Sequence, residues 1–154
     1  AKFIESGLVA PAQPPTVKVE TVGRPPATGR LGESTQGHGC SLSASVVEDP
    51  AKPGILYKPK EGTKLIAVEI TIANDANEVL DVNPLYATLV DAQGFVYRLE
   101  LAGRDGQLQT VKLSKGEKAK GWVAFEVPKT AAVHSLKYQT DIVRGNYLRV
   151  GLTK

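Results

Sequence analysis

Residues 64–74 read KLIAVEITIAN, and this segment decides the fold class. Branched aliphatic residues occupy every second position, at Ile66, Val68, Ile70 and Ile72. The positions between them hold small or polar residues, at Ala67, Glu69, Thr71 and Ala73. Because successive side chains of a strand point to opposite faces, this pattern predicts a β-strand with one face in a core and the other in solvent.

Shorter segments with the same period of two lie on both sides of this strand, separated by turn-forming residues. They are 41–47, 86–90, 95–99, 108–113, 120–127, 135–140 and 147–152. Helical periodicity is weak throughout. Their number and spacing predict an all-β fold, an immunoglobulin-like antiparallel β-sandwich of about 7–9 strands formed by residues 40–154.

Two details of this sandwich can be predicted. Residues 91–94 (DAQG) join segments 86–90 and 95–99, and a four-residue connection with a late Gly is typical of a β-hairpin. In segment 120–127 alternation places Val123, Phe125 and Val127 on one face. We expect this face to lie across the sandwich from the aliphatic face of segment 64–74.

Residues 1–39 differ from the rest of the chain. They contain five of the ten Pro and six of the fifteen Gly, so this segment is not expected to form a core of its own. One piece of it, residues 16–22, alternates, with Val17, Val19 and Val22 as its apolar members. We therefore divide the chain into an extended N-terminal arm (1–39) and a sandwich (40–154). The arm is either a flexible tether or an added strand that docks on a sheet edge of its own or another chain.

Composition and charge exclude several classes of protein. The 154 residues are 42% hydrophobic and 23% charged, as in a soluble globular domain, and the net charge of +3 comes from scattered basic residues. We therefore expect no nucleic-acid partner, and no apolar run is long enough to predict a membrane span. The chain contains no Met and starts at Ala1, from which we expect a processed, exported protein.

Four segments carry a family resemblance: EGTKLIAVEITIAN at 61–74, LVDAQG at 89–94, LSKGE at 113–117 and GWVAFEVP at 121–128. Together they resemble the telokin-like, immunoglobulin-like domains of bacterial exported proteins and lipoproteins of unknown function. The resemblance implies a fold and an extracytoplasmic location, and it implies no catalytic residues. Cys40 lacks the aliphatic residue three positions earlier that a lipid-attachment site has, so we do not expect anchoring through it.

The sequence contains few residues that could form a metal site or a catalytic site. The chain has two His and one Cys, so a copper or zinc site would draw on His38, Cys40 and His134 at most, without the axial Met of blue-copper centres. We expect Cys40 to be a small, partly buried thiol at the start of the first strand. No Gly-x-Ser-x-Gly elbow is present either. We therefore expect no catalytic, metal or cofactor-binding residues.

Trp122 is the only Trp, and alternation places it on the face away from Val123 and Phe125. It either packs beneath the N-terminal segment or marks a contact surface.

The chain is thus predicted to be a non-catalytic secreted or cell-surface module. Such a module would contact a protein partner, or a second copy of itself, through a sheet edge, with Val17, Val19, Val22 and Trp122 as interaction residues. The alternatives are a small-ligand or metal carrier and, third, an enzyme.

Overall fold

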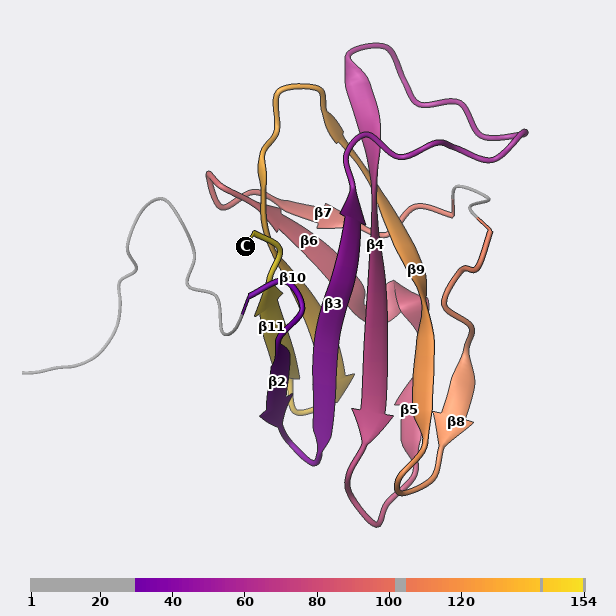
Figure 1. Ribbon diagram of the computed structural model, residues 1–154, viewed down its shortest axis with the longest axis vertical. Helices are drawn as coiled ribbons and strands as arrows, with labels where there is room; N and C mark the ends of the chain where they lie inside the picture. Colours follow the sequence, from indigo (N-terminus) through magenta and orange to yellow (C-terminus); the bar gives the residue numbers. More distant parts are fainter. Residues whose placement is uncertain (1–29, 102–104, 142, 154) are drawn as a thin grey trace, which may run out of the picture.

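The computed structural model describes residues 30–101, 105–141 and 143–153 (Figure 1). In these ranges the chain forms strands joined by turns and one short 3₁₀ turn, η1 (Pro84–Tyr86). The strands are β2 (Ser34–Gly37), β3 (Cys40–Glu48), β4 (Thr63–Asn74), β5 (Leu80–Val82), β6 (Ala87–Asp91), β7 (Val96–Arg98), β8 (Val111–Leu113), β9 (Lys118–Pro128), β10 (Val133–Asp141) and β11 (Asn146–Gly151). The prediction of an all-β fold is confirmed.

Two four-stranded sheets lie face to face (Figure 1). One has the strand order β2-β3-β4-β9 and the other the order β11-β10-β6-β7, while β5 and β8 form a small ribbon beside β9. Neighbouring strands within these sheets pair antiparallel. The architecture is therefore a β-sandwich, as predicted.

Strand β4 lies inside its sheet, between β3 and β9, and it corrects one expectation about the core. Ile66 pairs with Phe125 and Val68 pairs with Val123, so the two aliphatic faces are neighbours in one sheet rather than partners across the sandwich. Both faces nevertheless point into the core. The opposite sheet contributes Ala87, Leu89, Leu136, Tyr138, Leu148 and Val150 to the same cluster.

The outer face of β4 is not wholly exposed, contrary to the sequence prediction. Leu65 and Ala67 are buried there, and Ala124, which pairs with Ala67 from the neighbouring strand β9, is buried as well. Together with Ala51 they form a second, smaller cluster, against which Tyr57 and Trp122 pack. The period of two in the sequence identified the two faces correctly, but it could not show that the loop between β3 and β4 returns to cover part of the outer one.

The N-terminal edge of the sandwich begins earlier than residue 40. Strand β2 pairs with β3 from Ser34 to Gly37, and the backbone N–H of Leu31 donates to the carbonyl of Thr153 at 3.3 Å. Residues 34–37 therefore belong to the sandwich and not to the arm, and β3 is not the first strand. The predicted added strand at 16–22, with Val17, Val19 and Val22, lies outside the described residues.

Candidate functional site

The turn between β6 and β7 is built around the carboxylate of Asp91, the last residue of β6. Its Oδ1 accepts hydrogen bonds from the backbone N–H groups of Gln93 and Phe95, each at 2.9 Å. The backbone N–H of Asp91 in turn donates to the carbonyl of Phe95 at 3.0 Å, and Gly94 has the positive φ that the turn requires. The hairpin predicted for this segment is confirmed.

The second carboxylate oxygen of Asp91 binds a side chain from the returning strand. The hydroxyl of Tyr97 donates to Oδ2 at 2.9 Å, and Asp91 is only 4% exposed. Burial, followed by the hydrogen bond to Asp91, raises the pKa of Tyr97 to about 12. The hydroxyl of Tyr97 is thus a donor, and three hydrogen bonds hold the carboxylate in place.

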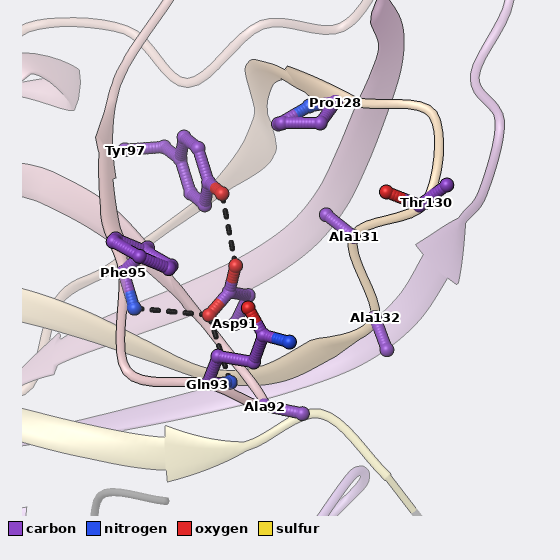
Figure 2. A pocket seen from close by; sticks show the side chains of 9 residues that line it. All are labelled: Asp91, Ala92, Gln93, Phe95, Tyr97, Pro128, Thr130, Ala131 and Ala132. Carbon is purple, nitrogen blue, oxygen red and sulfur yellow. Dashed lines mark hydrogen bonds between the residues drawn. The ribbon is translucent and has the colours of Figure 1, made fainter. Parts of the chain in front are cut away.

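A pocket of about 380 Å³ lies beside this hairpin (Figure 2). Its other wall is the turn that joins β9 to β10, where the N–H of Ala131 donates to the carbonyl of Pro128 at 3.0 Å. The two turns are joined by a hydrogen bond of 2.8 Å from the N–H of Ala92 to the carbonyl of Ala132. The lining residues are Asp91, Ala92, Gln93, Phe95, Tyr97, Pro128, Thr130, Ala131 and Ala132.

The pocket combines apolar walls with polar side chains, those of Asp91, Gln93, Tyr97 and Thr130. Its volume falls within the range of about 300–1,000 Å³ that is usual for small-molecule sites. Phe95, at the rim, is 62% exposed. Both carboxylate oxygens of Asp91 already accept hydrogen bonds, whereas no side-chain hydrogen bond holds Gln93 or Thr130 in Figure 2. The arrangement is suited to holding an apolar group that carries a hydrogen-bonding atom.

None of the residues that line this pocket was predicted from the sequence to be a functional residue. The available signal was the Asp at the start of a four-residue turn, because Asp commonly accepts hydrogen bonds from the backbone two residues further along. The other wall could not be found in this way, since residues 128–132 are distant in sequence and come close only through the pairing of β10 with β6.

The structure places Trp122 elsewhere, on the outer face of β9. Its backbone N–H donates to the carbonyl of Gly106, and its carbonyl accepts from the N–H of Leu108, both at 2.9 Å. A Cβ on Gly106 would lie 3.3 Å from Cδ1 of Trp122, so the indole ring packs closely beneath this segment. Trp122 is therefore partly covered, and the covering chain is residues 106–108.

The potential metal ligands are not brought together. His38 occupies the turn between β2 and β3, where it lines a groove with the start of β11. His134 lies at the start of β10, near the other end of β11, and its carbonyl accepts from the N–H of Leu152. Cys40 is buried, its Sγ donates to the carbonyl of Gly37 at 3.4 Å, and burial, with a smaller contribution from Asp75, raises the pKa of the thiol. Among the described residues no three His, Cys, Asp or Glu side chains are grouped so as to hold a metal ion.

A family model now bears on these observations. Residues 30–148 match the model of a domain of unknown function, DUF4352. The chain belongs to the DUF4352 family. The match includes β2, which agrees with the pairing of β2 with β3 in the sandwich. No curated protein matches this DUF4352 chain.

Solved structures share the fold of this DUF4352 domain. The yjhA protein of Bacillus subtilis superposes with a TM-score of 0.64 at 17% identity, covering 81% of this chain and 99% of yjhA. MPT63, a secreted protein of Mycobacterium tuberculosis, gives 0.63 at 15% identity, covering 84% and 98%. The candidate lipoprotein ycdA of Bacillus subtilis gives 0.63 at 12% identity, and the match covers 78% of this chain but 38% of ycdA. At these identities the similarity shows the fold alone.

In the described parts of this DUF4352 chain, no helix is both long enough and apolar enough to cross a bilayer.

Proposed function

We propose that this DUF4352 chain is a non-catalytic, extracytoplasmic module that binds a protein partner through the pocket beside the β6–β7 hairpin. The observation that carries the proposal is the exposed, apolar rim of a preformed hollow. Phe95, which lines the pocket, is 62% exposed, and Val96, next to it on the hairpin but outside the lining set, is 54% exposed. Aromatic side chains such as Phe are enriched in protein interfaces relative to the rest of the surface.

The pocket's ionisable groups support binding rather than catalysis. A nucleophile or general base needs a lone pair or a proton that is free to react with a substrate. Asp91 and Tyr97 are hydrogen-bonded to each other, and Asp91 also holds the turn.

The extracytoplasmic location is supported by the two neighbours that are a secreted protein and a candidate lipoprotein. The resemblance to telokin-like domains of exported proteins, read from the sequence, points to the same location. Retrieval of the native protein from the extracellular or envelope fraction would test this part of the proposal directly.

A second contact element in the proposal is strand addition at a sheet edge. Strands β2 and β11 are edge strands of different sheets, and they flank a groove of about 470 Å³. An arriving strand can pair with such an edge. Deletion of residues 1–25, which removes Val17, Val19 and Val22, should change the native mass by light scattering or the thermal stability. Unchanged values for both would show that the segment is only a tether.

A small apolar ligand is the second candidate occupant of the pocket, because the volume and the mixture of apolar and polar lining side chains also suit a molecule of that kind. A carrier would retain such a molecule through purification. Native mass spectrometry of the protein from its own host would show an adduct if the pocket carries a ligand.

Site-specific photo-crosslinking tests the protein-binding proposal. A photoreactive residue at position 95 should trap a protein in the native host, whereas one at position 143 should not, although Val143 is 95% exposed on the turn before β11. Thr130→Trp should abolish trapping because Thr130 lines the pocket. Lys129→Trp, an exposed neighbour outside the lining set, should preserve it. Trapping that Thr130→Trp leaves intact would contradict the proposal.

A further inference from the structure

The loop between β3 and β4 ends in two fully exposed aliphatic side chains. The chain leaves β3 after Glu48, extends away from the sandwich and returns to β4 at Thr63 (Figure 1). At its tip the N–H of Tyr57 donates to the carbonyl of Gly54 at 3.1 Å, which closes a β-turn. Ile55 and Leu56 occupy the two corner positions of this turn, and they are 101% and 100% exposed.

Large aliphatic residues are unusual at turn corners, where Gly, Pro, Asn, Asp and Ser predominate for conformational reasons. Ile55 and Leu56 pack against no core in the structure, so folding does not account for them. Adjacent apolar side chains held out in solvent are typical of a surface that is covered in the functional state.

The base of the loop is fixed to the sandwich. Tyr57 donates a hydrogen bond from its hydroxyl to Oε1 of Glu126 on β9, and its ring packs on the outer cluster of β4 and β9. Oε2 of the same carboxylate accepts from the N–H of Lys60 at 3.0 Å and from Oγ1 of Thr63 at 2.8 Å. These contacts fix the base of the loop on the sandwich, and the tip beyond it lies in solvent.

The tip segment itself carries only basic charges. Residues 52–60 read KPGILYKPK, with Lys52, Lys58 and Lys60, while the acidic Glu48 and Asp105 lie behind the apex and border the hollow that Ile55 and Leu56 line. Aliphatic side chains at the apex with basic side chains behind them match the layers of an anionic bilayer, whose hydrocarbon lies beneath negatively charged headgroups.

We propose that the 52–60 tip inserts Ile55 and Leu56 into the surface of an anionic lipid bilayer, with Lys52, Lys58 and Lys60 at the level of the headgroups. A lipid surface fits better than a protein because a stable protein interface buries roughly 800 Å² on each partner, far more than two protruding side chains provide. The proposal uses none of the residues that line the pocket, and it stands or falls independently of the partner proposed for that pocket.

Co-sedimentation with vesicles tests the insertion. The full chain should bind vesicles of phosphatidylcholine and phosphatidylglycerol and should bind phosphatidylcholine alone much more weakly. Replacing both Ile55 and Leu56 with Ser should lower the partition coefficient on the mixed vesicles by roughly one to two orders of magnitude, from the apolar area withdrawn from the bilayer. Val143→Ser, which removes another exposed aliphatic side chain, on the turn between β10 and β11, should leave the coefficient unchanged.

Substitution of the basic residues provides a second test of the proposal. Replacing Lys52, Lys58 and Lys60 with Gln should also weaken binding, by about fivefold for each charge close to the surface. If the lysine variant loses binding but the Ser variant retains it, the protein merely adsorbs through its charge, and the insertion is refuted. An absence of vesicle binding by the wild type would refute it as well and would favour a protein as the partner of the tip.

Discussion

The hydroxyl of Tyr97 on β7 donates a 2.9 Å hydrogen bond to Oδ2 of Asp91 at the end of β6, and this contact ties the two strands of the hairpin together beneath the pocket. Oδ1 of Asp91 holds the backbone of the turn itself. One buried carboxylate therefore fixes both the path of the turn and the wall that Phe95 and Tyr97 form. The pocket is thus preformed and does not depend on a ligand for its shape.

Removal of this hydroxyl should destabilise the fold. Tyr97→Phe leaves the buried carboxylate with one acceptor unsatisfied, which costs about 1–3 kcal/mol of unfolding free energy in urea denaturation. Tyr147→Phe is the matched control because Tyr147 is 46% exposed and its ring lies against the cations of Lys137 and Arg149. If both variants lose the same stability, the Asp91–Tyr97 bond does not support the hairpin.

The two described Phe residues provide a test of the core. Phe125 is fully buried, so Phe125→Ala should cost about 3–5 kcal/mol. Phe95 is 62% exposed, and Phe95→Ala should change the unfolding free energy by less than about 0.5 kcal/mol. Equal midpoints in chemical denaturation would mean that the faces of β9 are assigned incorrectly, since a slip of one residue reverses every side chain.

Gly121 permits the close approach of the segment that covers Trp122. A Cβ at this position would lie 2.5 Å from Cα of Leu108, so Gly121→Ala must displace the 106–108 backbone. We expect a loss of about 1–3 kcal/mol and a red shift in the fluorescence of Trp122, the only Trp. In Gly37→Ala the new Cβ would meet only Cδ2 of Leu148, at 3.1 Å, and a flexible side chain can move. A larger loss of unfolding free energy for Gly37→Ala than for Gly121→Ala would be inconsistent with this packing.

The stability of the fold should depend on pH through the carboxylate of Glu126, which lies beneath the 52–60 tip. The hydrogen bond from Tyr57, then that from the Lys60 N–H and the weaker one from Thr63, lower the pKa of Glu126. Because the folded-state pKa is lowered, the stabilisation is present above the ordinary Glu pKa of about 4.3 and is lost as the pH falls through the folded value.

Glu126→Gln should therefore be less stable than the wild type at neutral pH, by about 1 kcal/mol because the carboxylate is partly exposed to solvent. The difference in melting temperature should narrow as the pH falls below about 4.3. Glu78→Gln, at an exposed Glu, should show no such narrowing. A gap between Glu126→Gln and the wild type that stays constant down to low pH would exclude Glu126 as the titrating group.

The main strands were predictable from the sequence because each has several alternations of apolar and polar residues. Strand β4 is correctly placed to within one residue, and so are the turn and strands of the β6–β7 hairpin. Strand β5 was missed since three residues contain too few alternations to be recognised, and Tyr86 belongs to η1, which is capped by the side chain of Asn83.

The pocket and the tip were not predictable for a different reason. The pocket forms between residues 91–97 and 128–132, whose proximity depends on strand pairing rather than on any local pattern. At the tip, the sequence shows Ile55 and Leu56 but not their exposure, because an aliphatic pair after Pro53-Gly54 could equally have started a strand. Periodicity identifies faces of elements, whereas a site depends on which elements meet.

The central claim is that a partner side chain occupies the pocket. The most direct test is to purify the crosslinked partner and to measure its affinity for the wild-type chain and for matched variants of this chain. Isothermal titration calorimetry with the wild type, Thr130→Trp and Lys129→Trp would give the three dissociation constants. The account predicts that Thr130→Trp weakens binding by at least about tenfold, the equivalent of 1.4 kcal/mol, while Lys129→Trp binds as the wild type does. Equal dissociation constants for all three proteins would contradict it.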